Sequence, residues 1–252
     1  MKGFLLDMDG VLYRGGKPIP EALRFLSRLQ KEKIPYLLLT NHGCLTPAGF
    51  SKKLEHMGIR VPPARIYSSS EATAEWLSKR GVRHVFAIGE AGVFQALRRH
   101  GVRTSKKKVR HVVVGLDRKI TYDHLKTACN LISGGACFIG TNPDASYPVE
   151  SGHAPECGAL LAAIQSATGK QPTIIGKPEP TIFRQAAHRL GLPVKQLTMI
   201  GDRLDTDILG AKKAGARSIL VLTGHTTRAL LRQSKIRPDQ VVASLDQLIA
   251  TL

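Results

Sequence analysis

Short apolar runs alternate with amphipathic segments along almost the whole 252-residue chain, and this alternation restricts the fold more than any other feature. The apolar run at 3–6 (GFLL) precedes a segment with helical spacing at 20–33, in which Pro20 stands at a typical helix start. The run at 35–40 (PYLLLT) precedes a second helical segment at 46–58. Strands that alternate with helices predict an α/β fold with mainly parallel sheets.

Similar apolar runs continue to the end of the chain, which gives about ten predicted strands in one very large sheet or two smaller ones. The middle of the chain contains its own strand–helix repeats and ends in the Gly- and Pro-rich stretch TGKQPTIIGKPEP. We therefore expect two domains. One is a discontinuous core of residues 1–80 and 177–252, and the other is an inserted α/β domain of residues 81–176.

Composition limits the setting of the protein and its partners. No apolar run approaches the roughly 20 residues that span a membrane, and no signal peptide is recognisable, so we expect a cytoplasmic protein without membrane contact. The four cysteines form no Cys-x-x-Cys pair, which fits reduced thiols.

The net charge of +18, from 37 Lys and Arg against 19 Asp and Glu, is unusual. A field of this sign attracts phosphates, nucleotides or nucleic acid. The basic residues are scattered apart from the runs at 105–111 and 228–237, and only 5% of residues are aromatic, which leaves little material for base stacking. These features favour a generally basic surface over a dedicated nucleic-acid site.

Polar side chains follow four of the predicted strands. Ligands of an open parallel sheet collect beyond the carboxyl ends of its strands, so residues at these positions are candidates for a site. One pair of acids after a strand is common in an ordinary turn. Acids, a hydroxyl, an amide and a lysine at four strand ends are much less expected by chance. The residues are Asp7 and Asp9, Thr40 and Asn41, Lys177, and Asp202 with Asp207.

Carboxylates gathered in this way repel one another, and one is driven neutral unless a cation lies among them. Mg²⁺ suits such oxygen ligands and keeps room for waters and a phosphate oxygen. Asp7 can then attack phosphorus and form an aspartyl-phosphate, while Asp9 protonates the leaving alkoxide and later activates water. Lys177 would neutralise phosphate charge, and Thr40 and the backbone around Asn41 would donate hydrogen bonds to phosphate oxygens.

Four short motifs, DMDGVLYRG, LLLTNHG, GKPEP and GDRLDTDI, resemble in order the four motifs of the haloacid dehalogenase superfamily of phosphatases. Almost the entire chain is similar to the subgroup related to NagD and the p-nitrophenyl phosphatases. The resemblance implies a Rossmann-like parallel-sheet core with an α/β cap domain inserted between the second and third motifs. It also implies a magnesium-dependent phosphatase.

Residue by residue, the resemblance implies that Asp7 is the nucleophile and a metal ligand. Asp9 matches the general acid/base and offers its backbone carbonyl to the metal, while Asp202 matches a direct metal ligand. Asp207 matches an acid that acts through water or orients the ligands. Asp205 falls at a variable position of the motif and is expected to be a solvated loop acid. Thr40 and Asn41 match the phosphate-binding pair, and Lys177 matches the motif-three lysine.

The segment at 142–153 (NPDASYPVESGH) is Pro-rich and polar, and an ordinary connecting loop is one interpretation. In the similar family this loop closes over the core site and reads the leaving group, so Asp144 and Tyr147 are candidate substrate contacts. Motif two departs from the more frequent TNNS-like ending through the residues 42–44 (HGC). This departure concerns the identity of the substrate and not the reaction.

We expect hydrolysis of a small phosphomonoester, such as a sugar phosphate, a glycerol or glycolate phosphate, or a nucleotide. Two alternatives stay open: a phosphotransferase on the same fold, and a basic nucleic-acid-binding protein on a disused phosphatase scaffold. Dehalogenation is disfavoured because it needs no metal and hence no cluster of acids. Caps of similar proteins can pair, so a homodimer is among the expected assemblies.

Overall fold

The computed structural model describes residues 2–106, 109–149 and 152–249. The chain forms two compact units. The first unit comprises residues 1–40, 50–67 and 177–252, and the second comprises residues 41–49 and 68–176.

The predicted insert, residues 81–176, lies wholly within the second unit. That unit also contains helix α3 (Ser69–Lys79), because α3 packs against helix α4 (Ala91–Arg99).

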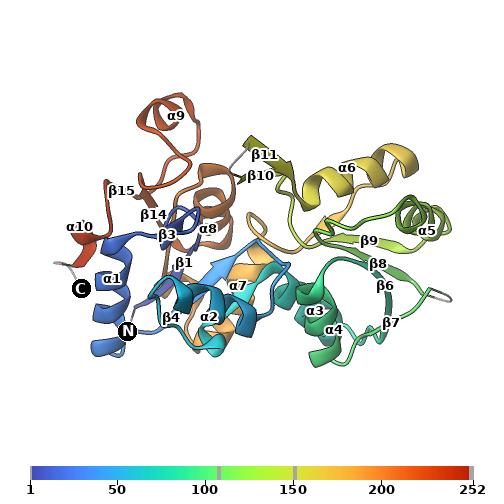
Figure 1. The fold of residues 1–252 in the computed structure, drawn as a ribbon, viewed down its shortest axis with the longest axis horizontal. Coiled ribbons are helices and arrows are strands. Elements are labelled where there is room, and N and C mark those ends of the chain that lie inside the picture. Colours follow the sequence, from blue (N-terminus) through green and yellow to red (C-terminus); the bar gives the residue numbers. More distant parts are fainter. Residues whose placement is uncertain (1, 107–108, 150–151, 250–252) are drawn as a thin grey trace. The chain divides into compact units, whose positions relative to one another are not determined.

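A six-stranded sheet in the order β15-β14-β13-β1-β4-β5 forms the centre of the first unit (Figure 1). The neighbouring strands from β15 to β4 run parallel to one another. The chain adds strands outward from β1 on one side and outward from β13 on the other, so the direction of winding reverses between these two strands. The strands are β1 (Gly3–Leu6), β4 (Tyr36–Thr40), β5 (Ile66–Ser68), β13 (Leu197–Gly201), β14 (Arg217–Val221) and β15 (Gln240–Val242).

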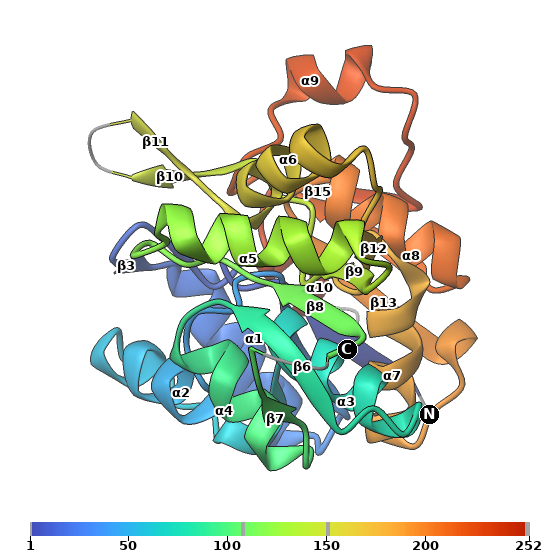
Figure 2. The same ribbon diagram turned by 90° about the vertical axis from the view of Figure 1, so that its right-hand side faces the viewer.

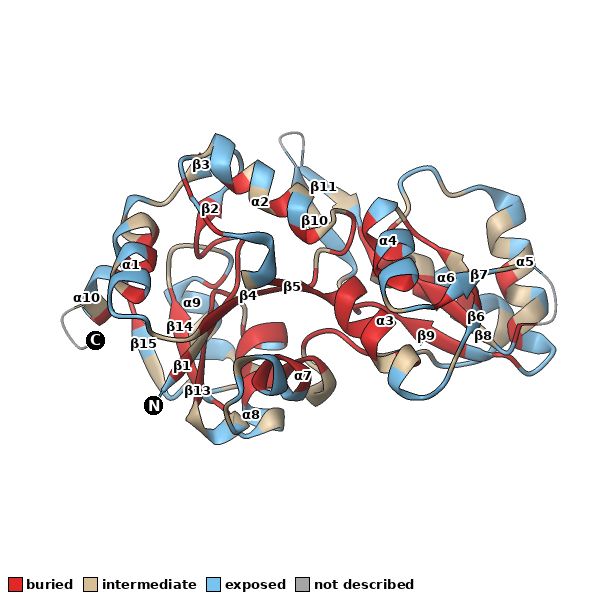
Figure 3. Ribbon diagram, turned by 90° about the horizontal axis from the view of Figure 1, so that it is seen from below, coloured by how far each residue is buried: buried red, intermediate tan, exposed pale blue. Residues whose placement is uncertain are grey.

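Burial explains why these runs form strands. All five residues of β4 and all five of β13 are buried, as expected for a parallel sheet that helices cover on both faces (Figure 3). Phe25 of α1 packs edge-on against Phe4 of β1, with ring centroids 5.7 Å apart. The helices are α1 (Pro20–Lys31), α2 (Pro47–His56), α7 (Pro180–Leu190), α8 (Leu209–Ala214), α9 (Arg228–Gln233) and α10 (Asp246–Ile249).

Three short elements complete the first unit. A small hairpin of β2 (Tyr13–Arg14) and β3 (Lys17–Pro18) follows β1, and a π-helical turn at Leu204–Ile208 precedes α8. Short 3₁₀ turns occupy Pro63–Arg65 and Val194–Gln196.

The second unit is built on a five-stranded parallel sheet in the order β12-β9-β8-β6-β7. Helices α5 and α6 cover one face of this sheet and α4 covers the other (Figures 1 and 2). A buried apolar cluster fills the space under α5 and α6 and includes Phe86, Val112 and Leu161. The elements are β6 (His84–Ile88), β7 (Arg103–Thr104), β8 (His111–Val114), α5 (Tyr122–Ser133), β9 (Cys137–Gly140), α6 (Cys157–Thr168) and β12 (Thr173–Ile174).

The predicted cap segment at 142–153 contains most of an antiparallel hairpin and not only a loop. Its strands are β10 (Ser146–Val149) and β11 (Gly152–Pro155). Residues 150 and 151 of this segment, and residues 107 and 108 of the basic run at 105–111, lie outside the described residues.

The α/β class with parallel sheets is confirmed. The run PTIIG supplies β12, which pairs with β9 of the second unit through Thr173 and Ile139. Lys177 therefore follows a strand of the second sheet, while its own residue belongs to the first unit. Within the described residues, no helix combines the length and apolar character that membrane spanning requires.

Candidate active site

Two acids mark the point where the first sheet reverses its winding. Asp7 follows β1 directly, and Asp202 follows β13 directly. The backbone N–H of Asp7 donates to the carbonyl of Ile200, 2.9 Å away, and this bond ties the two strand ends together. A switch point of this kind is where open parallel sheets bind ligands, so the fold places both carboxylates at the expected location of a site.

A third acid, Asp207, comes from the π-helical turn after β13. Its Oδ2 accepts a hydrogen bond from the backbone N–H of Arg203 at 3.1 Å. Carboxylate oxygens of Asp7, Asp202 and Asp207 all lie within 4.8 Å of one another, and all three residues are buried.

Lys177 lies among these acids. Its Nζ donates to Asp7 Oδ1 and to Asp207 Oδ1, both at 2.7 Å, and to the carbonyl of Leu39 at 3.0 Å. Burial acts to lower the pKa of Lys177, but Asp207 and Asp7 outweigh it and hold the pKa above its ordinary value. The side chain is therefore a charged ammonium group at neutral pH, although it is only 2% exposed.

One ammonium group does not balance three carboxylates. Burial is the main cause that raises the pKa of Asp7, of Asp202 and of Asp207, the last to about 6. If all three acids are ionised, the cluster carries two excess negative charges in a buried place, which is costly without compensation. A divalent cation would supply the missing charge.

Asp202 offers a direct test of whether a cation fits. Its Oδ2 accepts a hydrogen bond from the backbone N–H of His225 at 2.6 Å. Its Oδ1 is buried and has no hydrogen-bond partner among the described residues. A buried carboxylate oxygen left without a partner is unfavourable, and oxygen is the ligand that Mg²⁺ prefers. The residues present therefore fit a magnesium ion held by Asp202 and Asp7.

Glycines make room for the Asp202 carboxylate. A side chain on Gly10 or on Gly224 would overlap it, and Gly10 also has a φ of +74°, which glycine adopts readily. Gly10 belongs to the DMDGVLYRG motif, so this part of the motif serves the packing of the site.

Asp9 is exposed and is held by a residue that the sequence analysis did not single out. Tyr13 Oη donates to Asp9 Oδ2 at 3.1 Å. Lys53 Nζ of α2 in turn donates to Tyr13 Oη at 3.3 Å and lies 4.5 Å from the centre of the Tyr13 ring. The place of Tyr13 in the DMDGVLYRG motif is a sequence signal for a role near Asp9, whereas nothing in the sequence links Lys53 to Asp9. Asp205 pairs with Arg203 at 2.7 Å, and its side chain is exposed.

The predicted phosphate-binding pair lies at the end of β4. Thr40 is the last residue of that strand and is buried. Asn41 follows it in the chain and is placed with the second unit, where its Nδ2 donates to Asp144 Oδ2 at 2.7 Å. Tyr147 of β10 lies near His42, with ring centroids 6.1 Å apart. The structure thus brings Asp144 and Tyr147 to the loop that follows Thr40.

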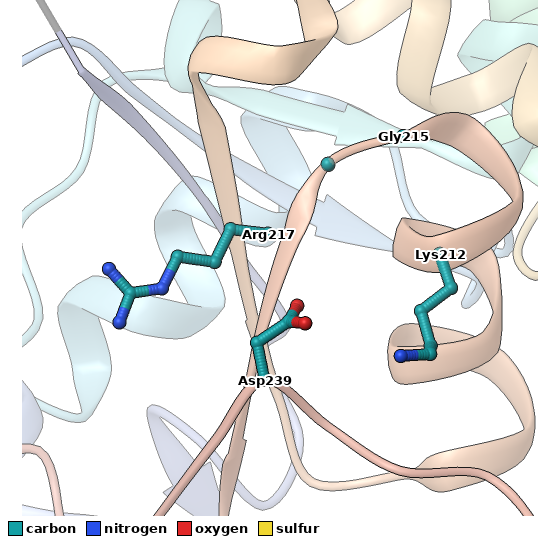
Figure 4. A pocket seen from close by; sticks show the side chains of 5 residues that line it. Lys212, Gly215, Arg217 and Asp239 are labelled. Carbon is teal, nitrogen blue, oxygen red and sulfur yellow. The ribbon is translucent and has the colours of Figure 1, made fainter.

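A shallow hollow elsewhere in the first unit is lined by Lys212, Gly215, Ala216, Arg217 and Asp239 (Figure 4). Arg217 begins β14, so this hollow lies at the amino ends of the parallel strands, on the opposite edge from Asp202. Asp239 already accepts hydrogen bonds from the N–H and the hydroxyl of Ser218. The hollow is therefore separate from the acid cluster.

Comparison with known proteins gives a consistent result. Residues 4–103 match the model of a family described as haloacid dehalogenase-like hydrolase, and residues 174–248 match a second, HAD-hydrolase-like model. The chain is 40% identical to a dihydroxyacetone phosphatase of Corynebacterium glutamicum over 97% of this chain and 90% of that protein. It is 37% identical to the 5'-nucleotidase YutF of Bacillus subtilis, over 98% of this chain and 97% of that protein.

A solved structure with a similar fold is that of NagD from E. coli K-12. It has a TM-score of 0.92 and 31% identity, and the match covers 97% of each chain.

Proposed function

Since this chain belongs to the haloacid dehalogenase-like hydrolases and is a NagD-like phosphatase, we propose that it cleaves its substrate through an aspartyl-phosphate on Asp7. The predicted family and enzyme class are confirmed, and the activity is on small phosphorylated substrates. The observation that carries the proposal is the buried cluster of Asp7, Asp202 and Asp207, in which the Lys177 ammonium group contacts Asp7 and Asp207.

In the first step, a carboxylate oxygen of Asp7 attacks phosphorus, and the bond between phosphorus and the ester oxygen breaks. Asp9 gives its proton to the leaving oxygen, which departs as an alcohol. In the second step, Asp9 takes a proton from a water molecule that attacks the aspartyl-phosphate. Inorganic phosphate leaves, and both acids return to their starting states.

The remaining residues of the cluster serve charge balance. Lys177, at 2.7 Å, acts to lower the pKa of Asp7 against the effect of burial and lowers the repulsion between Asp7 and an anionic substrate. Asp202, Asp7 and the backbone carbonyl of Asp9 would hold Mg²⁺, with Asp207 acting through water or by orienting the ligands. When bound, the ion neutralises charge on the phosphoryl group and on the attacking carboxylate.

Phosphate oxygens would accept hydrogen bonds from Thr40 and from the backbone around Asn41. The relatives are named as a dihydroxyacetone phosphatase and a 5'-nucleotidase, so we propose a small phosphorylated metabolite, such as a sugar phosphate or a nucleotide, as the substrate. Tyr147 is proposed to contact its leaving group.

The proposal is tested by an activity screen over phosphomonoesters, with Mg²⁺ and with EDTA. Asp7→Asn should abolish turnover while the circular dichroism spectrum stays that of the folded protein. Full activity of this variant would remove Asp7 as the nucleophile. Comparing free phosphate with phosphate transferred to added sugars separates hydrolysis from the phosphotransferase alternative. The cytoplasmic location, the homodimer and the absence of nucleic-acid binding stay predictions.

A further inference from the structure

Hydrogen bonds within the second unit hold the loop at 41–44 in place. Ser69 Oγ donates to the carbonyl of Asn41 at 2.6 Å, and Ser70 Oγ donates to the carbonyl of Gly43 at 2.8 Å. The backbone N–H of Gly92 donates to the carbonyl of Cys44 at 2.7 Å. Three carbonyls of the loop are thus held by residues in the first turns of α3 and α4.

The side chain of Asn41 is held by the same unit. Its Nδ2 donates to Asp144 Oδ2 at 2.7 Å. Its Oδ1 lies against the backbone of Gly176, where an added Cβ would come within 2.7 Å of that oxygen. The Asn41 side chain is therefore enclosed on its acceptor side and hydrogen-bonded on its donor side.

Asp144 is itself fixed by a chain of polar side chains. Its Oδ2 also accepts from Asn142 Nδ2 at 2.9 Å, and the same Nδ2 donates to Glu156 Oε2 at 2.8 Å. The carbonyl oxygen of the Asn142 side chain accepts from Thr141 Oγ1 at 2.8 Å. Hydrogen bonds in such a buried chain reinforce one another, so Asp144 is rigidly placed.

The ends of the β10–β11 hairpin are closed at the same place. The backbone N–H of Glu156 donates to the carbonyl of Ala145 at 3.0 Å, and the N–H of Gly158 donates to the carbonyl of Asp144 at 2.7 Å. A side chain at position 158 would overlap the carbonyl of Pro143, so glycine permits this approach. The base of the hairpin and the Asn41 anchor are one hydrogen-bonded structure.

These contacts bear on phosphate binding because Asn41 directly follows Thr40. Adjacent Cα atoms are about 3.8 Å apart, so the loop at 41–44 starts directly after Thr40, and its own hydrogen bonds fix the direction of its N–H groups. Donors held in place before the substrate arrives need no reorganisation when phosphate binds.

We infer that Asp144 is a positioning residue that acts through Asn41: it holds the loop at 41–44 in the conformation that binds phosphate. The inference rests on the proposed function, in which the backbone of this loop donates to phosphate. It differs from the sequence-based expectation that Asp144 contacts the leaving group, since Asp144 Oδ2 already accepts two amide hydrogen bonds.

Inorganic phosphate is the decisive probe because it has no leaving group. Binding of phosphate in Mg²⁺ buffer is measured by isothermal titration calorimetry for the wild type and for Asp144→Ala. Loss of the anchoring hydrogen bonds should weaken phosphate binding about tenfold. The KM values for p-nitrophenyl phosphate and glycerol phosphate should rise by the same factor as each other. Asp123→Ala, which removes an exposed acid of the same unit, is the matched control and should bind phosphate as the wild type does.

A double-mutant cycle tests whether Asp144 works through Asn41. If it does, Asn41→Ala/Asp144→Ala should bind phosphate no more weakly than Asn41→Ala alone. Additive losses would overturn the inference. So would unchanged phosphate binding in Asp144→Ala together with ester KM values that change with the leaving group.

Asp144→Asn keeps an acceptor for Asn41 and serves if the alanine variant does not fold. It should bind phosphate within about twofold of the wild type and leave the ratio of ester KM values unchanged. A change in that ratio with unaltered phosphate binding would overturn the inference. Failure of the wild type to bind phosphate or to hydrolyse any ester would instead overturn the proposed function.

Discussion

Replacing Lys177 with methionine tests the charge balance of the acid cluster. The ammonium group lies 2.7 Å from Asp7 and 2.7 Å from Asp207, and the residue is only 2% exposed. Methionine retains an apolar chain of similar length, so the main change is the loss of charge. Removing one partner of a buried ion pair costs about 3–5 kcal/mol, because the other partner is left buried and uncompensated. We expect the free energy of unfolding without metal to fall by about this amount.

A surface ion pair of similar geometry provides the control. Lys213 lies 2.9 Å from Glu179, but their side chains are 40% and 37% exposed. An exposed pair contributes about 0–1 kcal/mol, so Lys213→Met should have little effect. Both variants are compared with the wild type by urea unfolding in EDTA, followed by circular dichroism.

Two further results are expected of Lys177→Met. Added Mg²⁺ should stabilise it more than it stabilises the wild type, because the ion replaces the lost positive charge. Without the ammonium group, the pKa values of the acids in the folded state rise further above those of the unfolded chain. The folded variant then binds more protons than the unfolded chain. The difference in free energy of unfolding between the wild type and Lys177→Met should therefore become smaller as the pH falls. Equal losses in Lys177→Met and Lys213→Met would refute the reasoning.

Tyr13→Phe removes the hydrogen bond to Asp9 and should lower kcat about tenfold for an alkyl phosphate, whose leaving group needs a proton. It should lower kcat less than about twofold for p-nitrophenyl phosphate, whose leaving group needs none; equal losses would show that Tyr13 does not act through Asp9. Burial raises the pKa of Glu156 to about 7. The folded protein therefore holds this proton more tightly than the unfolded chain does, which stabilises the fold at low pH. This contribution is lost as the pH rises to about 7. Glu156→Gln does not titrate, and its stability relative to the wild type should rise by on the order of 2–3 kcal/mol between about pH 5 and pH 8 in thermal unfolding; a flat difference would contradict this.

The acids at the ends of β1 and β13 could be predicted from the sequence for a simple reason. The runs that precede Asp7 and Asp202 are apolar throughout, which is typical of strands buried on both faces. Parallel strands have their carboxyl ends at one edge of the sheet, so residues far apart in the chain are expected to meet there.

Contacts that depend on packing between elements could not be predicted in this way. The run before Lys177 forms β12 of the second sheet, so the hydrogen bonds of Lys177 to Asp7 and Asp207 do not follow from the pattern of strands. Lys53 of α2 donates a hydrogen bond to Tyr13, and the helical spacing of the α2 sequence does not predict that contact. The grouping of Asn41 with the second unit depends on hydrogen bonds from Ser69 and Asp144, which no local propensity encodes.

The departure from the usual ending of motif two has separate physical causes at its three positions. A side chain on Gly43 would overlap the Ser70 hydroxyl, so the packing of α3 favours glycine there. Cys44 is buried, and burial raises the pKa of its thiol to about 12, so it is an unreactive packing residue. These two positions follow from the structure of the second unit and carry no information about the substrate.

His42 is different, because its side chain is 34% exposed and is not required to fill a packed space. It stands two positions after Thr40 in the chain, so its Cα lies within about 7 Å of the Thr40 Cα. Its ring lies 6.1 Å from the ring of Tyr147, the residue proposed to contact the leaving group. Of the three departures, His42 is therefore the one whose position allows it to distinguish one phosphate ester from another.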